Sequence, residues 1–281
     1  MKQIASGIWG ETDYIGCNNG CIVTDAGLVL VDPPMCPSET VKWKEAVTEL
    51  GEVKYLINTE HHGDHVGGNW FFRDATIVSH AVTRENTPDG IGTLDFWRGR
   101  IEKMDPAGLP LLEGYEITPA EMTYDEEMAI DLGGREIRLI HKPGHTEGQT
   151  LVYVPDAKAL LPGDNVVVDW PPLLQSGVGR AWLDCLDFIE GLDVETILPG
   201  HGKVCGKEAV SSLRADITEL MDRVCGCIGK GLSEEETRST VRYDRRWKSV
   251  PEMLHERYEM LFDQGVGRLY RELRPEPAGR F

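Results

Sequence analysis

The sequence predicts a mixed α/β fold made of two similar strand-rich halves whose sheets pack together. Short apolar runs separated by Gly, Asn and Asp fill residues 4–31, and a second strand-rich block covers residues 128–161. After each block comes a helical pattern and then an apolar run that leads into a turn carrying histidine. We expect a single domain of 281 residues, with a core over about 4–205, an insertion over about 87–125 and a helical C-terminal extension over about 206–281.

Five short strands and one helix are expected in the first half. The strands nearest the N-terminus read as an antiparallel meander, because their apolar residues come in short runs between turn residues. Pro37 and Ser38 begin a helix that ends near Leu50, with Ser38 as the N-cap and Gly51 as the stop. The expected strands cover residues 4–9, 21–24, 28–31, 54–58 and 76–79.

The insertion over residues 87–125 has a different composition from its surroundings. Proline and glycine recur through it, interleaved with apolar residues such as Leu94, Phe96 and Trp97. This pattern predicts a long connection with one helix near residues 94–104. Long connections of this kind are usually functional or mobile.

The second half repeats the order of elements and adds a helical tail. In the tail, Leu213 and Ile217 fit one face of a helix packed on the body, and Ser233 and Glu236 have the spacing of a capping box. The expected strands cover residues 128–131, 136–140, 151–154 and 159–161, followed by a helix over 180–191 and a strand over 196–198.

Composition limits the class of partner. The net charge of -18 would repel nucleic acids and anionic membranes, so a small-molecule substrate is expected. No stretch approaches the roughly 20 apolar residues of a membrane span, and the N-terminus lacks the apolar region of a secretory signal, which predicts a cytoplasmic protein. The seven cysteines are scattered without a Cys-x2-Cys pair and read as free thiols. A homo-oligomer is left open.

Histidine and aspartate gather where predicted strands end. Three of the eight histidines lie within five residues, two more each follow a Pro-Gly pair, and a Pro-Gly-Asp segment lies between those two. Such turns expose the next side chain, so the segments can meet at one metal site. The residues concerned are His61, His62, Asp64, His65, His145, Asp164 and His201. We interpret the isolated His80, His141 and His255 as structural or surface residues.

In order and spacing, these motifs resemble those of the metallo-β-lactamase superfamily over about residues 4–205. Residues 57–69 (INTEHHGDHVGGN) resemble its signature loop, usually written His-x-His-x-Asp-His. Residues 142–150 (KPGHTEGQT), 161–164 (LPGD) and 198–202 (LPGHG) resemble its later ligand segments. The resemblance implies an αββα sandwich with metal ions in a cleft at one edge of the sheets.

The resemblance also implies a role for each residue. It implies that His62 and His145 bind a first metal ion, that Asp64, His65 and His201 bind a second, and that Asp164 bridges both. Asp64 would also orient or deprotonate a bridging water, and Asp32 would support the site. Independently of the family, imidazoles and carboxylates suit Zn, Fe and Mn, and two such ions lower the pKa of a shared water.

Glu60 departs from the family pattern, because it stands where the first histidine is expected. In an extended loop residues i and i+2 point the same way, so Glu60 should face the metal with His62 while His61 turns away. With Glu60 bound, the carboxylates of Glu60, Asp64 and Asp164 leave a net charge of +1 on a centre with two divalent ions. Such oxygen-rich ligation favours Fe or Mn over Zn. The alternatives are that Glu60 contacts the metal ligands without binding metal itself, that the first metal site is weak or empty, or that His61 is the ligand in place of Glu60.

The resulting functional expectation is a metal-dependent hydrolase that uses a metal-bridging hydroxide on a small, partly hydrophobic ester, lactone or amide. One alternative is a di-iron oxygenase or other redox enzyme on the same fold, supported by Glu60. The other is a non-catalytic metal-binding member. Phe96, Trp97 and residues 168–174 are candidates for the cleft wall, and Arg180 or Lys203 for holding one carboxylate.

Overall fold

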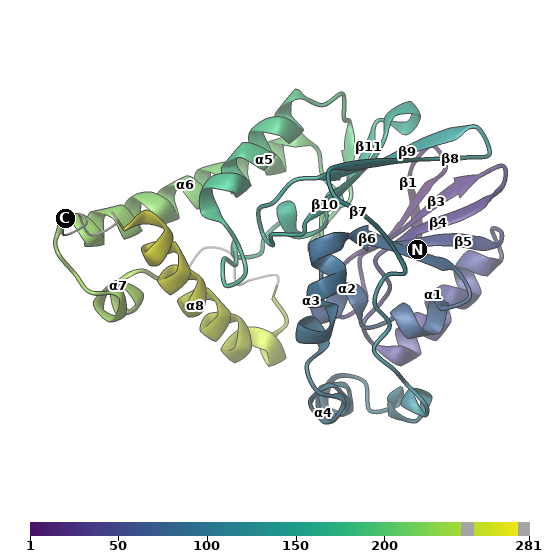
Figure 1. Cartoon of the computed structure of the whole chain (residues 1–281), viewed down its shortest axis with the longest axis horizontal. Helices are drawn as coiled ribbons and strands as arrows, with labels where there is room; N and C mark the ends of the chain where they lie inside the picture. Colours follow the sequence, from purple (N-terminus) through teal and green to yellow (C-terminus); the bar gives the residue numbers. More distant parts are fainter. Residues whose placement is uncertain (243–249, 275–281) are drawn as a thin grey trace.

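Two β-sheets pack face to face, and helices cover their outer faces (Figure 1). The computed structural model describes residues 1–242 and 250–274. Its αββα layering confirms the expected mixed α/β class and sandwich architecture.

The first sheet has seven strands that follow one another in chain order. Strands β1 to β4 pair as antiparallel neighbours, whereas β4 to β7 run parallel. The strands are β1 (Lys2–Ala5), β2 (Ile8–Glu11), β3 (Asn19–Thr24), β4 (Gly27–Val31), β5 (Val53–Asn58), β6 (Thr76–His80) and β7 (Met122–Tyr124).

The second sheet has five strands in the order β12-β11-β10-β9-β8. Only the β11–β12 pair is parallel, and the other neighbours are antiparallel. The strands are β8 (Glu127–Leu132), β9 (Arg135–His141), β10 (Thr150–Val154), β11 (Ala159–Leu161) and β12 (Thr196–Ile197).

The apolar core between the sheets follows from strand alternation. In β9, Ile137 and Leu139 are fully buried while Arg138 between them is exposed, as a period of two residues requires. Ile137 and Leu139 pack in one cluster with Ile22 and Val29 of the first sheet. This shared core holds the strand ends of both halves in a fixed relation, and those ends carry the candidate site.

Helices complete the two outer layers. On the first sheet, α1 buries Trp43 and Val47, and on the second, α5 and α6 bury residues such as Ile189 and Leu213. The helices are α1 (Pro37–Thr48), α2 (Gly63–Val66), α3 (Ala81–Ile91), α4 (Leu94–Met104), α5 (Gly179–Gly191), α6 (Lys207–Gly229), α7 (Glu234–Thr240) and α8 (His255–Leu273).

Two local predictions in the first half are wrong. Residues 4–9 do not form one strand, because Gly7 adopts a left-handed conformation with φ of 69° and turns the chain between β1 and β2. Ser38 is not the N-cap of α1: the helix begins at Pro37, and the Ser38 hydroxyl donates a hydrogen bond to Asp105 at 2.8 Å.

The insertion is more regular than predicted. The helix expected at residues 94–104 is present as α4. Beside it, the structure contains the end of α3, which includes Pro88, a 3-10 turn at Leu109–Leu112, and the edge strand β7. Proline and glycine frequency alone therefore overstated the irregularity of this segment.

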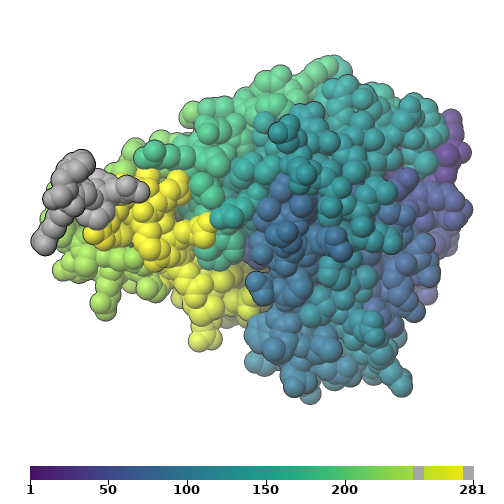
Figure 2. Space-filling model, in the orientation of Figure 1, coloured from purple at the N-terminus to yellow at the C-terminus, as the bar shows by residue number. Residues whose placement is uncertain are grey.

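The C-terminal helices pack on the second sheet and return toward the first half. The capping box of Ser233 and Glu236 is present at the start of α7. In Figure 2 the C-terminal segment, coloured yellow, lies beside the blue segment of the first half. Residues 243–249 and 275–281 of the predicted extension lie outside the described part. Among the described residues, no helix is long and apolar enough to cross a membrane.

Candidate metal centre

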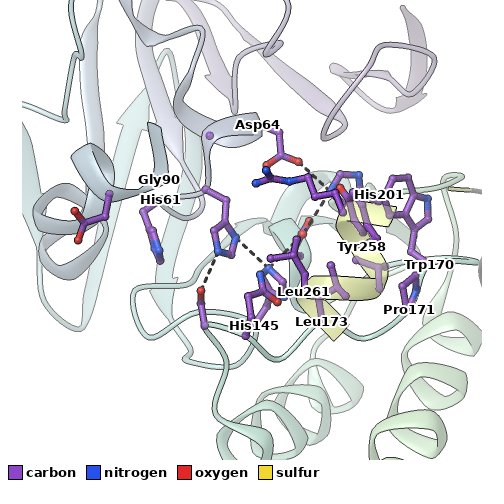
Figure 3. Close-up of a pocket in the computed structure, with 18 of the residues that line it drawn as sticks. His61, Asp64, Gly90, His145, Trp170, Pro171, Leu173, His201, Tyr258 and Leu261 are labelled. Carbon is purple, nitrogen blue, oxygen red and sulfur yellow. Dashed lines mark hydrogen bonds and ion pairs between the residues drawn. The ribbon is translucent and has the colours of Figure 1, made fainter. Parts of the chain in front are cut away.

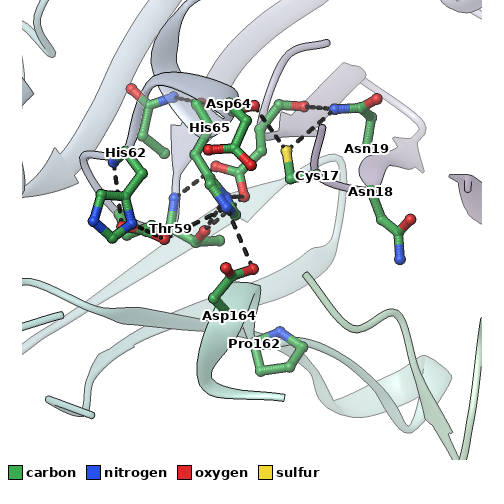
Figure 4. A network of polar contacts seen from close by, with 12 residues as sticks. Cys17, Asn18, Asn19, Thr59, His62, Asp64, His65, Pro162 and Asp164 are labelled. Atoms are coloured by element: carbon green, nitrogen blue, oxygen red, sulfur yellow. Dashed lines mark hydrogen bonds and ion pairs between the residues drawn. The ribbon is translucent and has the colours of Figure 1, made fainter. Parts of the chain in front are cut away.

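Turns at one edge of the two sheets bring the predicted residues together. The loop after β5 and the short helix α2 carry the first group, and the loop between β9 and β10, the turn after β11 and the turn after β12 each add one residue. The structure thereby gathers all seven predicted ligand residues, which are Glu60, His62, Asp64, His65, His145, Asp164 and His201. Figure 3 shows the members of this cluster that line a pocket, and Figure 4 shows the polar contacts around His62, Asp64, His65 and Asp164.

Glu60, His62 and His145 form the first group of donor atoms, which we call the Glu60 triad. Glu60 Oε2 lies 2.8 Å from His62 Nδ1, and Glu60 Oε1 lies 3.5 Å from His145 Nε2. The two histidine nitrogens are 3.2 Å apart. Glu60 is fully buried and faces the same space as His62, as the i, i+2 relation predicted.

Asp64, His65 and His201 form the second group, which we call the Asp64 triad. His201 Nε2 lies 3.3 Å from Asp64 Oδ2. Asp164 lies between the two triads: its Oδ1 is 3.3 Å from His65 Nε2, and its Oδ2 is 3.5 Å from His145 Nε2. This position allows Asp164 to contact ions in both triads.

Glu60 is also closer to the second triad than the sequence suggested. Its Oε1 lies 3.4 Å from His65 Nε2, and Glu60, His65 and Asp164 form a third group of neighbouring donor atoms. A side chain expected at one ion therefore reaches toward both.

His61 does not belong to any of these groups of donor atoms. Its ring centroid lies 4.8 Å from that of His62, and its Nδ1 is buried without a hydrogen-bond partner among the described residues. Rather than turning into solvent, His61 lines the cavity beside Gly90 (Figure 3).

Asp32 contacts the His65 ring nitrogen that faces away from the other donor atoms. It accepts hydrogen bonds from the Thr59 backbone N–H at 2.8 Å and from the Thr59 hydroxyl at 2.6 Å, and its Oδ2 lies 2.9 Å from His65 Nδ1. Asp32 adopts φ of 52°, a strained conformation for a residue with a side chain, which is common at functional sites. A hydrogen bond at Nδ1 orients the ring and leaves Nε2 free for a ligand.

Other supporting residues had weak or no sequence signals. Asn165 Oδ1 accepts a hydrogen bond from the His145 backbone at 2.9 Å, and Ser176 Oγ lies 3.1 Å from His62 Nε2. The ring of Trp170 stacks on His201 with centroids 4.2 Å apart. Asn165 directly follows the Pro-Gly-Asp segment, and Trp170 lies in the segment 168–174 predicted as a cleft wall, whereas no motif marked Ser176.

Cys17 is a further residue that the sequence reasoning set aside. Its thiol donates a hydrogen bond to the Asp64 backbone carbonyl at 3.0 Å (Figure 4). Burial raises the pKa of the Cys17 thiol to about 12. Its sulfur also lies in a group of neighbouring donor atoms with Asp32 and His65. None of the seven cysteines forms a disulfide.

Glycine in the Pro-Gly turns permits the close approach of the segments. A Cβ on Gly200 would overlap the carboxylate of Asp164, and a Cβ on Gly163 would overlap Thr59. Gly163 also has φ of 54°, which favours glycine. The turns therefore serve both to expose a ligand and to let neighbouring ligands meet.

The electrostatics of the cluster favour bound cations. Burial opposes ionisation of Glu60, but the neighbouring imidazoles outweigh it and lower its pKa to about 2. In the same way, burial is outweighed at Asp64 and Asp164, whose pKa values lie well below the usual range. Burial of His201 is outweighed by Asp164, which raises its pKa to about 10. Divalent ions can replace the protons that this negative field attracts.

The donor set fits two divalent metal ions. The ligand atoms of each triad lie within 4.8 Å of one another. His65 Nε2 and Asp164 Oδ1 are buried without a hydrogen-bond partner among the described residues, and buried polar atoms of this kind require a partner. Imidazole nitrogens and carboxylate oxygens are ligands of Zn, Fe and Mn.

A cavity of about 290 Å³ opens above the cluster (Figure 3). The segment predicted over residues 168–174 contributes part of its apolar wall, through Trp170, Pro171 and Leu173. The insertion also lines the cavity, through Asp89, Gly90 and Arg100. Its predicted aromatic residues do not: Trp97 is fully buried in a separate core, and Phe96 is 52% exposed.

The basic side chains that line the cavity are not the predicted ones. Arg180 and Lys203 are exposed and do not line the cavity, whereas Arg100 and Arg257 do. Tyr258 lines it beside Arg257, which shows that α8 belongs to the cavity wall.

Comparison with known sequences places these features in a family. A family model described as the metallo-beta-lactamase superfamily matches residues 13–201. The chain is 28% identical to acyl-coenzyme A thioesterase MBLAC2 of Homo sapiens, over 69% of this chain and 74% of that protein. It is 25% identical to hydroxyacylglutathione hydrolase of Rhodospirillum rubrum, over 67% of this chain and 57% of that protein. The chain thus spans from just over half to about three quarters of these relatives.

Solved structures show the same fold. A metallo-beta-lactamase family protein from Thermus thermophilus has a TM-score of 0.67 at 19% identity, covering 95% of this chain and 92% of that chain. A metallo-beta-lactamase from Pontibacter korlensis has a TM-score of 0.60 at 17% identity, covering 77% and 97%. At these identities the likeness concerns the fold alone.

Proposed function

We propose a hydrolytic reaction for this chain, which belongs to the metallo-beta-lactamase superfamily. The relatives with which it aligns are hydrolases, and enzymes of this superfamily bind divalent metal ions. We infer that the chain is a metal-dependent hydrolase of a small, partly hydrophobic thioester or ester. The observation that carries this proposal is the convergence of seven donor side chains, five of which line a cavity with an apolar wall.

The class of scissile bond comes from the relatives and from the cavity. One relative is named as an acyl-coenzyme A thioesterase and another as a hydroxyacylglutathione hydrolase, and both names describe removal of an acyl group from a thiol carrier. In this chain, Trp170, Leu173 and Leu261 offer an apolar surface for an acyl chain. A thioester therefore heads the proposed substrates, followed by an ester, a lactone and an amide.

The proposed ligands divide as the triads do. The Glu60 triad would hold one divalent ion and the Asp64 triad the other, with Asp164 in reach of both. When bound, such ions lower the pKa of a shared water and polarise the acyl carbonyl.

The chain's own residues set the geometry of the reaction. Asp64 is placed at the cavity floor to orient the attacking water by accepting its hydrogen bond. Asp32 fixes the His65 ring, and Trp170 both fixes the His201 ring and excludes bulk water from that side. Each of these roles needs a rigid support, which the strand ends provide.

A substrate panel tests the proposal. The purified protein is stripped of metal, reloaded separately with Zn, Mn or Fe(II), and assayed on S-butanoyl thioesters, butanoate esters, a lactone and an amide. We expect thiol release that disappears with a chelator and returns with metal. A fully metal-loaded protein that hydrolyses none of the panel would contradict the proposal.

A di-iron redox enzyme is the second candidate, and Glu60 favours it. Glu60 is fully buried among the donor atoms and gives the site a third carboxylate, which suits iron and manganese better than zinc. Elemental analysis of protein purified without added metal, together with oxygen uptake, separates the candidates. Bound iron with a visible absorption band and oxygen consumption would favour the redox enzyme over the hydrolase.

A further inference from the structure

Two arginines from distant parts of the chain converge at the cavity. Arg100 lies on α4 of the insertion, and Arg257 lies near the start of α8. Both are half-buried and both line the cavity above the metal centre. Both helices lie outside the two sheets whose strand ends carry the ligand residues.

Arg100 lies directly against the metal-binding loop. Its guanidinium carbon is 5.6 Å from the centroid of the Trp97 ring, which packs beneath it. Its Nη1 lies 3.2 Å from the position that a Cβ on Gly63 would take, and Gly63 separates His62 from Asp64. Glycine at this position leaves room for the guanidinium beside the ligands.

The two guanidiniums have no ion-pair partner in the described part of the chain. Across residues 1–242 and 250–274, neither forms an ion pair or a hydrogen bond with another described residue. Arg214 and Arg268, by contrast, pair with Asp187 and Glu147 at 2.6 Å and 2.9 Å.

The charge of Arg100 also acts on Arg257. Burial and then the nearby charge of Arg100 lower the pKa of Arg257, although Asp64 opposes them. Two half-buried positive charges that form no ion pair destabilise the protein. A bound anion would offset this cost through charge-assisted hydrogen bonds.

We propose that Arg100 and Arg257 together bind one anionic group of the substrate, a carboxylate or a phosphate. Guanidiniums present paired N–H donors that match the oxygens of these groups. The apolar wall formed by Trp170, Pro171 and Leu173 remains available for the acyl chain. The substrate class is therefore an anionic thioester or ester. The proposed anion site is inferred from the two arginines alone. The assignment of the scissile bond as a thioester or ester rests on the proposed function.

A competing role for the arginines is to balance the carboxylates of the metal centre. Arg257 lies near enough to Asp64 for the two charges to interact. In that case, removing either guanidinium would change metal affinity and would affect anionic and neutral ligands equally. The test therefore compares matched ligands that differ only in charge.

Equilibrium binding measures the anion site without catalysis. The probes are 3-(pentylthio)propionate, its neutral amide 3-(pentylthio)propionamide, and 2-(pentylthio)ethyl phosphate, all thioethers that cannot be hydrolysed. Calorimetry on the metal-loaded protein gives their affinities. We expect both anions to bind more tightly than the amide, and the tighter of the two identifies the source of the charge.

The variants Arg100→Gln and Arg257→Gln carry the test. Each should weaken anion binding about 10- to 100-fold, the range for losing a charge-assisted contact, with less than about a twofold effect on the amide. Arg84→Gln is the matched control, because Arg84 is exposed on α3 and does not line this cavity. Arg257→Lys keeps the positive charge but loses the paired N–H donors of the guanidinium, so it should retain part of the affinity for the anions. Partial retention would show that the loss in Arg257→Gln is not caused by misfolding.

The outcomes distinguish the two proposals. Equal weakening of all three probes, or no change for the anions, overturns the anion site. Anion binding that depends on the arginines, in a protein that hydrolyses no thioester, supports the anion site and contradicts the proposed function. Where hydrolysis occurs, S-butanoyl-3-mercaptopropionate should have a lower KM than S-butanoyl-3-mercaptopropionamide, and this difference should vanish in Arg257→Gln.

Discussion

The Glu60 triad and the Asp64 triad are supported in different ways. In the Asp64 triad no side chain is more than 13% exposed, His65 Nδ1 lies 2.9 Å from the Asp32 carboxylate, and His201 is stacked on Trp170. In the Glu60 triad the His62 side chain is 22% exposed, and its Nε2 lies 3.1 Å from the Ser176 hydroxyl, its one hydrogen-bond partner among the described residues.

This contrast separates two properties of the metal centre. A ligand fixed from behind by a buried carboxylate loses little freedom when it binds, which favours high affinity. A more open triad with an unusual anionic ligand can instead determine which metal is preferred. We therefore expect the Asp64 triad to control retention of metal and the Glu60 triad to control its identity.

Asp164→Asn should have the largest effect, because Asp164 is the residue shared by the two triads. Loss of its charge should release both ions and reduce kcat/KM by more than the roughly 10- to 100-fold typical of a supporting residue. Metal content by mass spectrometry and activity on the best thioester check this. Retention of two ions per chain would show that Asp164 is not a shared ligand.

Asp32→Asn should weaken the Asp64 triad selectively. An asparagine amide can donate to His65 Nδ1, which would place the ring proton on Nε2 and block the ligand position. We expect a loss of about 10- to 100-fold in affinity for one of the two ions, measured by stepwise metal titration. Ser38→Ala serves as a control because Ser38 bonds Asp105, away from the site.

Glu60→His should change metal preference more than total metal content. Replacing the carboxylate restores a charge of +2 at the two-ion centre and favours zinc by roughly tenfold, about 1.4 kcal/mol. Competition between Zn and Fe(II) measures this shift. Glu60→Gln, which keeps the shape and removes the charge, separates charge from ligand type. Unchanged preference in both variants would mean that Glu60 is not a ligand.

Ser176→Ala should have the smallest effect. Its hydroxyl lies 3.1 Å from His62 Nε2, and Ser176 lines the cavity. Losing it should reduce the affinity of the Glu60 triad for metal by less than about tenfold while the other ion is retained. If Ser176→Ala were as damaging as Asp32→Asn, the proposed difference in rigidity between the triads would be wrong.

Local sequence signals predicted the elements near the site well. The strand over 159–161 and the helix over 94–104 have the predicted bounds, and the capping box of Ser233 and Glu236 is present. Errors arose where one residue changed the local geometry, as at Gly7, or where proline lies inside a regular element, as Pro88 lies in α3. The backbone conformation at these positions depends on tertiary packing, which the periodicity of the sequence does not predict.

The sequence by itself determined the type, order and spacing of the ligand residues and the sharp turns that expose them, because these are properties of short segments. Only the tertiary structure decided that Glu60 reaches toward both triads, that Trp97 is buried while Trp170 lines the cavity, and that Arg100 and Arg257 line the same cavity. The cavity brings together α4 and α8, which are far apart in the chain. Their meeting depends on how those helices pack on the sheets, and no local pattern specifies that packing.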